Sequence, residues 1–359
     1  MKPTDVTKLR LFTQQIAGSE FKNPANLVHW MGAMQAQNYS MAKWAVGVRL
    51  PNSTDKIVEA AVDEGEIIRT HLLRPTWHLV AASDIHWMLE LTAPRIKASM
   101  KSRHEQLGLT PSLISKSNKL LEEVLRGGNH LTRGELKAEF KKINIETDNN
   151  RISHLLLRAE LDGVICSGRS KGNSQTYALL DERVPEKKSL SRNEALAELA
   201  RRYFSSHGPA TVNDFAWWSG LTLTDSRKAL EMVKSDFITD TINSQTYWFS
   251  NSFFIPEPDE PSVHLLPAYD EFIISYTDRG ATLSGEHNDK AISKNGMFWP
   301  VVIVNGQVAG LWKRTIKGNK VNLEVEPFQP FSKTVKDLIE KKATSFGDFL
   351  GKKAEEVTM

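Results

Sequence analysis

The chain has 359 residues and a formal net charge of +3, from 46 Lys and Arg against 43 Asp and Glu. This length exceeds one ordinary domain and predicts two to four modules. No apolar run is long enough to cross a bilayer and the N-terminus has no signal-peptide core, so we expect a cytoplasmic protein without membrane contact. The single cysteine, Cys166, excludes an internal disulfide and a cysteine-based zinc site, and we expect it to be a buried, inert thiol.

The first module is predicted over residues 1–108. Apolar spacing predicts four helices, which we place near 4–17, 24–37, 40–48 and 54–64. A hairpin is expected at 66–81, with Arg74-Pro75 at or near its turn. Helices followed by a hairpin are typical of a winged helix, although the spacing here is looser than in the two modules that follow.

The second module is predicted over residues 109–188. Thr132 and Glu135 have the spacing of a capping box and predict a helix that contains Leu136, Phe140 and Ile143. Residues 148–150 are expected to cap a second helix, which Gly163 ends. The strands 164–167 and 175–180 are then expected to flank a flexible basic turn at 168–174.

The third module, residues 189–255, repeats this order. An amphipathic helix is expected at 193–206 and a break at Gly208-Pro209. Thr211 is expected to cap a helix over 212–219, and Thr224 to open another over 225–234. Two short strands, 237–241 and 246–250, are predicted around Asn243-Ser244.

The last module, residues 256–359, has a different pattern. Short β-type runs broken by Pro and Gly predict a small antiparallel, barrel-like sheet with strands near 263–266, 272–276, 299–304, 308–312 and 321–325. Asn305-Gly306 is a strong signal for a type I′ turn, and Gly318-Asn319 is a second turn signal. A helix at 332–350 is expected to close the chain.

These elements predict a mainly α fold with β structure, an α+β chain of tandem winged helices followed by the barrel-like module and a C-terminal helix. A helix–turn–helix with a two-stranded wing fits a DNA groove, so double-stranded DNA is the expected partner. The alternative interpretation is that any helical protein contains helix–turn–helix stretches by chance. We expect a monomer. We expect neither a metal nor a nucleotide cofactor, because the sequence has no metal-ligand spacing and no Gly-rich phosphate loop.

Several local sequences, in this order, resemble one bacterial family, the winged-helix family that contains the interstrand-crosslink DNA glycosylases. These sequences are Met34–Gln37, Arg69–Val80, Gly208–Gly220, Leu266–Phe272 and Val304–Arg314. The similarity extends from about residue 10 to about residue 330. It implies tandem winged helices and a barrel-like module arranged around a concave DNA-binding face.

The resemblance assigns catalysis to a Gln-apolar-Gln or Gln-apolar-Asp motif, and Gln35-Ala36-Gln37 matches the first form. A glutamine cannot take a proton at neutral pH, but its amide can orient a water molecule. That help is sufficient when the base leaves easily, as a cationic N7-alkylated purine does. One departure is Pro75, which stands where the glycosylases often have glycine.

The pattern around Gln35 and Gln37 also has a structural interpretation, because glutamines at helix ends often cap the helix or face water. On a regular helix, residues two apart point about 200° away from each other. Both amides are therefore expected to face one site only if the helix ends or distorts here, as Asn38 and the following residues indicate.

The residues predicted to contact DNA are basic side chains and one histidine on or near the helices and wings. They are Lys43, Arg69, Arg74, His78, Arg151, Arg169, Lys171, Lys313 and Arg314. For Arg74 the alternative is a tie between the hairpin and a helix C-terminus, and for His78 it is a satisfied core histidine. Trp217 and Trp218 are interpreted mainly as core residues, with one ring exposed.

Asp270 and Glu271 are the best carboxylate pair in the β region, but neighbouring residues of a strand face opposite sides. Asp270 is therefore interpreted as a structural partner of an arginine, with a place facing the cleft as the alternative. The resulting hypothesis is a DNA glycosylase for bulky N7-alkylpurines. The alternatives are a DNA-binding protein without catalysis, such as a regulator or shielding factor, and a protein-interaction scaffold.

Overall fold

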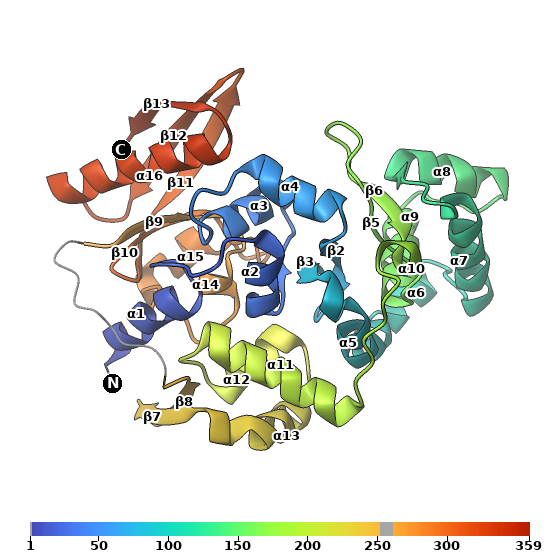
Figure 1. Cartoon of the computed structure of the whole chain (residues 1–359), viewed down its shortest axis with the longest axis horizontal. Coiled ribbons are helices and arrows are strands. Elements are labelled where there is room, and N and C mark those ends of the chain that lie inside the picture. The colour runs from blue at the N-terminus through green and yellow to red at the C-terminus, as the bar shows by residue number, and fades with distance from the viewer. Residues whose placement is uncertain (1, 252–260) are drawn as a thin grey trace. The chain divides into compact units, whose positions relative to one another are not determined.

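The computed structural model describes residues 2–251 and 261–359, and it is a mixture of helices and strands (Figure 1). The chain forms two compact units. Unit 1 contains residues 1–59, 196–218 and 222–359, and unit 2 contains residues 60–195 and 219–221. The two units are defined by contacts between residues, and the chain enters unit 1 three times. They do not test the four predicted modules, which stay a prediction.

The N-terminal elements are α1 (Pro3–Thr13), α2 (Pro24–Met31), β1 (Met34–Gln35), α3 (Tyr39–Gly47) and α4 (Asp55–Asp63). The four predicted helices are confirmed, but the second ends six residues earlier than expected. Gly32 ends α2 with φ +74°, and a Cβ at this position would lie 3.3 Å from the ring of Trp218. This tight approach favours glycine, which breaks the helix, so β1 replaces the predicted last turn.

Unit 2 begins with the end of α4 and the hairpin of β2 (Ile67–Leu72) and β3 (Thr76–Ala81), which confirms the predicted hairpin and its turn at Arg74-Pro75. The helices α5 (Ile85–Ser99), α6 (Lys101–Gln106) and α7 (Pro111–Leu125) follow. The sequence analysis did not predict these three helices.

The rest of unit 2 follows the predicted order. It contains β4 (Leu131–Thr132), α8 (Arg133–Lys142), α9 (Arg151–Leu161), β5 (Ile165–Ser167), β6 (Thr176–Leu179) and α10 (Leu180–Arg183). The capping box is confirmed, since Thr132 Oγ1 accepts from the Glu135 amide at 3.2 Å and Glu135 accepts from the Thr132 amide at 2.6 Å. The expected side-chain cap of α9 is wrong, because Asn150 is left-handed with φ +67° and makes no such bond.

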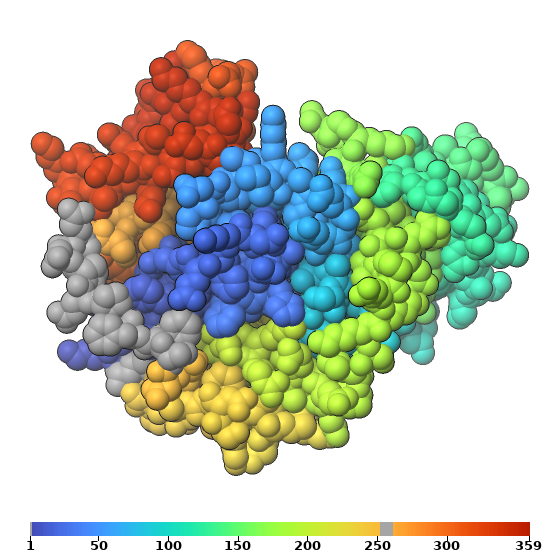
Figure 2. Space-filling view, in the orientation of Figure 1, coloured from blue at the N-terminus to red at the C-terminus, as the bar shows by residue number. Residues whose placement is uncertain are grey.

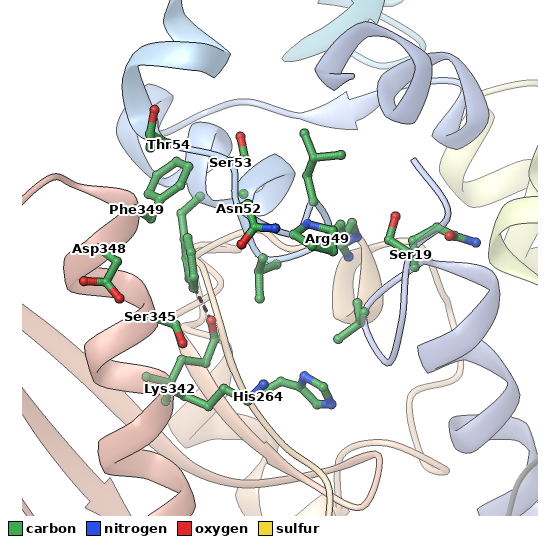
Figure 3. A pocket seen from close by; sticks show the side chains of 18 of the residues that line it. Ser19, Arg49, Asn52, Ser53, Thr54, His264, Lys342, Ser345, Asp348 and Phe349 are labelled. Atoms are coloured by element: carbon green, nitrogen blue, oxygen red, sulfur yellow. Dashed lines mark hydrogen bonds between the residues drawn. The ribbon is translucent and has the colours of Figure 1, made fainter. Parts of the chain in front are cut away.

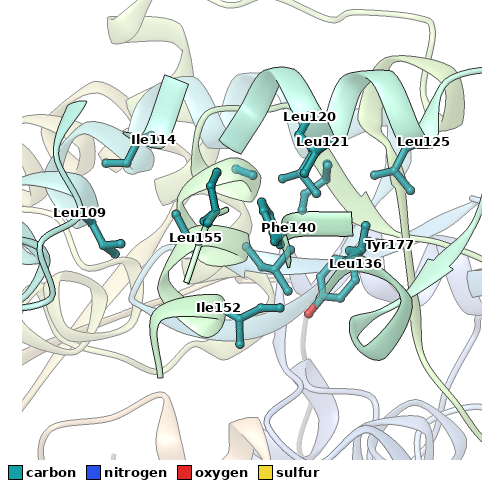
Figure 4. Packing of buried hydrophobic residues seen from close by; sticks show 14 residues of the cluster. Leu109, Ile114, Leu120, Leu121, Leu125, Leu136, Phe140, Ile152, Leu155 and Tyr177 are labelled. Carbon is teal, nitrogen blue, oxygen red and sulfur yellow. The ribbon is translucent and has the colours of Figure 1, made fainter. Parts of the chain in front are cut away.

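A single apolar cluster holds these helices against the sheet of order β4-β6-β5 (Figure 4). Leu121 and Leu125 of α7 and Leu136 and Phe140 of α8 are fully buried in it. Cys166 is also fully buried, and burial raises the pKa of its thiol to about 12. The thiol is therefore protonated at neutral pH, as expected for a structural cysteine.

The third predicted module is observed as α11 (Arg192–His207), α12 (Val212–Ser219), α13 (Leu223–Val233), β7 (Ile238–Ile242) and β8 (Gln245–Phe249). Thr211 Oγ1 accepts from the Asp214 amide at 3.2 Å, which confirms the cap of α12. The predicted opening of the next helix at Thr224 is wrong by two residues. Thr222 caps α13 instead, because its hydroxyl accepts from the Asp225 amide at 3.0 Å.

The C-terminal part contains a five-stranded open sheet of order β13-β12-β11-β10-β9. Its elements are β9 (Val263–Leu266), α14 (Glu271–Ile274), α15 (Asn288–Ala291), β10 (Val301–Val304), β11 (Gln307–Lys317), β12 (Lys320–Pro327), α16 (Lys333–Phe349) and β13 (Lys353–Thr358). The type I′ turn is confirmed by φ +51° at Asn305 and +83° at Gly306. Strands β11 and β12 form a long antiparallel hairpin (Figure 1), and Figure 2 shows the C-terminal part of the chain in orange and red.

Two expectations for this part are wrong. The predicted strand at 272–276 is the short helix α14, because Asp270 caps it by accepting from the Phe272 amide at 2.9 Å. The sheet is not purely antiparallel, since β13 pairs with β12 in parallel after the turn that follows α16. The predicted closing helix at 332–350 is confirmed as α16.

Helix α16 packs on this sheet and on α3 through aromatic rings. The ring centroids of Phe346 lie 5.0 Å from Trp44 and 5.2 Å from Trp312. Gly47 lies beside Phe349 so closely that a Cβ there would be 2.3 Å from a ring carbon. The contact between the two helices therefore depends on the missing side chain of Gly47.

We expect Gly47→Ala to lower the free energy of unfolding by about 1–3 kcal/mol, because the Phe349 ring must move from its packed position. In an open helix the same change stabilises by up to ~1 kcal/mol. Gly134→Ala in α8 is the control, since the nearest atom to its new Cβ is 3.9 Å away. Urea unfolding of both variants measures the difference, and an equal gain in stability would contradict this packing.

His264 of β9 gives a second prediction. Burial lowers the pKa of His264 from 6.5 to about 3, so between these values the unfolded chain binds a proton that the folded chain does not. The contribution of His264 to the free energy of unfolding is fully present above pH 6.5. It decreases as the pH falls, by about 1.4 kcal/mol at pH 5.5. We expect His264→Gln to remove this part of the difference between urea unfolding at pH 7.5 and pH 5.5. An unchanged difference would contradict the assignment.

Candidate active site

Gln35 and Gln37 lie outside any helix. Gln35 is in β1 and has 6% of its surface exposed, whereas Gln37 is exposed in the bend between β1 and α3. Ala36 between them is fully buried, and Asn38 caps α3 by accepting from the Met41 amide at 3.3 Å. The expected break in the helix is therefore present, and the 200° separation that a helix would impose does not apply.

The backbone of Gln35 is held by a buried carboxylate. Its amide donates to Glu271 Oε1 at 2.5 Å, and Glu271 is the first residue of α14. The second oxygen, Oε2, accepts from the Ser275 hydroxyl and from the Trp218 indole, the latter at 3.1 Å. Three donors thus converge on one side chain that is only 1% exposed.

His207 completes the surroundings of this carboxylate. Its Nε2 lies 3.6 Å from Glu271 Oε2, and its ring stacks on Tyr203 at 4.9 Å between centroids. Burial would raise the pKa of Glu271, but His207, Ser275 and the Gln35 amide lower it to about 2. Burial lowers the pKa of His207, while its hydrogen bond and charge interaction with Glu271 raise it, and Glu271 is ionised at neutral pH.

The neighbouring acid, Asp270, has a structural partner. Arg49 at the end of α3 donates to both of its carboxylate oxygens, at 2.7 and 2.8 Å, and both side chains are fully buried. The guanidinium also donates to the Gln14 backbone carbonyl and to its side-chain oxygen, each at 2.9 Å. This confirms the interpretation of Asp270 as the partner of an arginine.

The same network of hydrogen bonds extends from Gln14 to His207, next to Glu271. The side-chain amide of Gln14 donates to the Tyr276 hydroxyl at 2.9 Å, and this hydroxyl donates to the His207 carbonyl at 2.7 Å. The guanidinium of Arg10 lies 3.5 Å above the Tyr276 ring. Helices α1, α3, α11 and α14 are therefore linked by one buried set of hydrogen bonds.

We expect Arg49→Met to destabilise the chain by about 3–5 kcal/mol, because it leaves the Asp270 charge buried and unpaired. The matched control is Lys137→Met, which breaks an exposed ion pair with Asp148 whose N–O distance is 2.8 Å, and it should change nothing measurable. Urea unfolding followed by circular dichroism compares them. Equal, small effects would mean that the Asp270 pair contributes little to unit 1.

Three predicted DNA contacts lie on the β2–β3 hairpin of unit 2. The guanidinium of Arg69 lies 4.1 Å above the Trp77 ring, and its side chain is buried. His78 is fully buried and its Nδ1 lies 3.0 Å from the Thr76 carbonyl, as in a core histidine. Arg74 is half-buried beside Gly220. The buried position of His78 agrees with its structural alternative, and DNA contact by Arg69, Arg74 and His78 stays a prediction.

Two further predicted contacts lie in the loop between β5 and β6, which projects in Figure 1, and a third lies at the start of α9. Arg169 and Lys171 in this loop are exposed, and Lys171 pairs with Glu135 at 3.1 Å. Arg151 instead donates to the carbonyls of Glu146 and Leu107, so it holds the start of α9.

The other three predicted contacts lie in unit 1. Lys43 has 6% of its surface exposed and pairs with Asp55 at 2.6 Å, so its charge is compensated within the protein. Lys313 of β11 is exposed. Its neighbour Arg314 donates to the Ser40 hydroxyl at 2.7 Å and lies 5.7 Å from the Phe346 ring centre. Ser40 follows the glutamine motif by three residues, so β11 and this motif lie close together.

Trp217 and Trp218 differ in burial, as expected. Trp218 is fully buried and donates to Glu271, whereas Trp217 is 42% exposed and donates to the Ile274 carbonyl at 2.8 Å. Both tryptophans therefore fix α14, one at each of its ends.

A pocket of about 560 Å³ in unit 1 lies beside α16 and the end of α3 (Figure 3). Its polar lining includes Arg49, Asn52, His264 and Lys342. Neither glutamine of the motif lines it, so it is separate from the candidate site. Within residues 2–251 and 261–359 no group of three His, Cys, Asp or Glu side chains is placed to hold a metal, and no helix is long and apolar enough to cross a membrane.

The positions of Glu271 and His207 are not among the predicted site residues. In the predicted strand, the side chain of Glu271 would face away from Asp270. The sequence does contain a signal for helix α14. Asp270 stands shortly before a short apolar run, and an aspartate in this position often caps a helix.

Comparison with known proteins gives one consistent result. The family model described as "DNA glycosylase AlkZ-like" matches residues 28–349. An "Interstrand DNA cross-link repair glycosylase" from Streptomyces sahachiroi is 25% identical over 337 residues, which are 89% of this chain and 88% of that protein. The solved structure of Streptomyces sahachiroi DNA glycosylase AlkZ has the same fold, with a TM-score of 0.81, 21% identity and 99% coverage of both chains.

Proposed function

Because this chain belongs to the AlkZ-like DNA glycosylase family, we propose that it hydrolyses the N-glycosidic bond of bulky N7-alkylated purines in double-stranded DNA, crosslinked purines included. Family membership supports DNA binding and N-glycosyl hydrolysis. The class of lesion is our proposal, and it rests on the chemistry of the motif.

The observation that carries the proposal is the position of Gln35 and Gln37 in non-helical backbone. Because the backbone at these residues is not helical, the two side chains are not held on opposite sides of a helix. The two carboxamides then act on one water molecule, which they orient toward the anomeric carbon of the sugar. The exposed Gln37 is the one that substrate reaches first.

Neutral carboxamides restrict the substrate. They supply no strong general base, so the leaving group must depart with little help. An N7-alkylated purine carries a positive charge and leaves as a neutral base without protonation. A normal base or uracil lacks this advantage, so we propose that neither is excised.

We also propose that residues 1–108, 109–188 and 189–255 are winged helices that grip the duplex. The order helix, strand, two helices and two strands over 111–179 supports this for the second module. The exposed Arg169, Lys171 and Lys313 are proposed to bind phosphates. The more buried Lys43, Arg69, Arg74, His78, Arg151 and Arg314 are proposed to support the DNA-facing segments. We further propose a monomer in the cytoplasm.

We expect the purified chain to release N7-alkylguanine from duplex DNA faster than spontaneous depurination. Gln35→Ala and Gln37→Ala should each lower the single-turnover rate at saturating protein by roughly 10²-fold or more, because water placement is lost. Gln245→Ala, an exposed glutamine of β8, is the control and should keep the rate.

Abasic sites at the spontaneous rate, with no effect of Gln37→Ala, would refute the catalytic proposal. Duplex affinity that falls steeply with salt but without base release would then identify a DNA-binding protein without catalysis. Absent or salt-insensitive DNA binding would favour a protein-interaction scaffold instead.

A further inference from the structure

The motif that we propose to be catalytic contains no carboxylate, yet an ionised carboxylate lies directly behind it. Glu271 Oε1 accepts from the Gln35 amide at 2.5 Å. This bond joins the motif, on the strand β1, to the helix α14, more than two hundred residues later in the chain. A hydrogen bond to a charged acceptor is about twice as strong as one between neutral groups.

We propose that Glu271 is a positioning residue that fixes the Gln35-Ala36-Gln37 segment in its reactive geometry. This inference rests on the proposed function, because it assigns Glu271 a role through the glutamines of that site. Gln35 is otherwise in a strand of only two residues, and Gln37 lies in a bend. The bond to Glu271 fixes the backbone of Gln35 to the start of α14, and the position of the backbone determines where the side chain lies.

The anchor is itself immobilised. The Ser275 hydroxyl and the Trp218 indole donate to Glu271 Oε2, and His207 lies against the same oxygen. The His207 ring is itself held, because its Nδ1 lies 2.7 Å from the Ser206 hydroxyl. The donors to Oε2 and the packing of His207 therefore restrict the orientation of the carboxylate and with it the position of Oε1.

The charge of Glu271 is necessary for this arrangement. A carboxylate accepts at both oxygens, whereas a carboxamide accepts at one and donates at the other. In Glu271→Gln one of the two oxygens is replaced by an NH2 group. This NH2 group would face either the Gln35 amide or the two donors Ser275 and Trp218. Because glutamine has the same size and shape as glutamate, Glu271→Gln releases the Gln35 segment without creating a cavity.

The experiment measures base release and DNA affinity separately for Glu271→Gln. We expect the single-turnover rate at saturating protein to fall on the order of 10²-fold, as displacements of about 1 Å in a catalytic group do. Affinity for the same duplex should stay within about twofold, because Glu271 is buried and touches no DNA. Ser275→Ala, which removes one donor to Oε2, should lower the rate to a smaller extent and covers the case in which Glu271→Gln does not fold.

Asp214→Asn is the matched control. Asp214 is a second buried carboxylate of unit 1 that accepts four hydrogen bonds, from the amide and hydroxyl of Thr211 and of Thr277. It has no bond to the glutamine segment. Its change to a carboxamide should lower stability but leave the rate per folded molecule within about twofold.

The outcomes separate the two claims. If the wild-type chain releases no base, the proposed function fails and this inference fails with it. If the wild type is active but Glu271→Gln and Ser275→Ala retain its rate, only the positioning role is overturned. Equal rate losses in Glu271→Gln and Asp214→Asn also overturn it, because they would reflect a general effect of buried acids.

Discussion

The Glu271 carboxylate is the constraint on which the candidate site depends. It is almost completely buried and ionised, which is stable only because the Gln35 amide, Ser275, Trp218 and His207 surround it. Burial raises its pKa, whereas the hydrogen bonds and the charge interaction with His207 lower it, and the lowering prevails. Glu271, the first residue of α14, therefore connects the core of unit 1 to the segment that ends with the exposed Gln37.

The adjacent pair of Asp270 with Arg49 stabilises the same part of unit 1. Two neighbouring acids at one helix start have different partners: Asp270 pairs with Arg49, and Glu271 accepts from the Gln35 amide, Ser275 and Trp218. Asp270 holds α14 in place, and Glu271 transmits that position to β1. The chain belongs to a DNA glycosylase family. In the function that we propose, Gln35 and Gln37 supply no strong base, so they need precise placement more than a strong base would.

Much of the fold was predictable from local signals. The capping box at Thr132, the Asn305-Gly306 turn and the hairpin of β2 and β3 depend on residues close in sequence, and each is confirmed. The end of α2 was mispredicted, because Gly32 is approached by Trp218, far along the chain. Helix α14 was mispredicted although Asp270 is a local capping signal, and the bond of Glu271 to Gln35 spans 236 positions. Only a three-dimensional structure brings such pairs together. The glutamine motif itself was found by family resemblance, and its roles stay a prediction.

The most direct test of this account is the behaviour of the Gln35 backbone amide, observed by nuclear magnetic resonance in the ¹⁵N-labelled wild-type chain. A short bond to a buried carboxylate moves an amide proton far downfield and slows its exchange with solvent. The account predicts both effects at Gln35, in contrast to the exposed Asn38 three residues later. An amide at Gln35 with an ordinary shift and rapid exchange would contradict the claim that Glu271 fixes the motif.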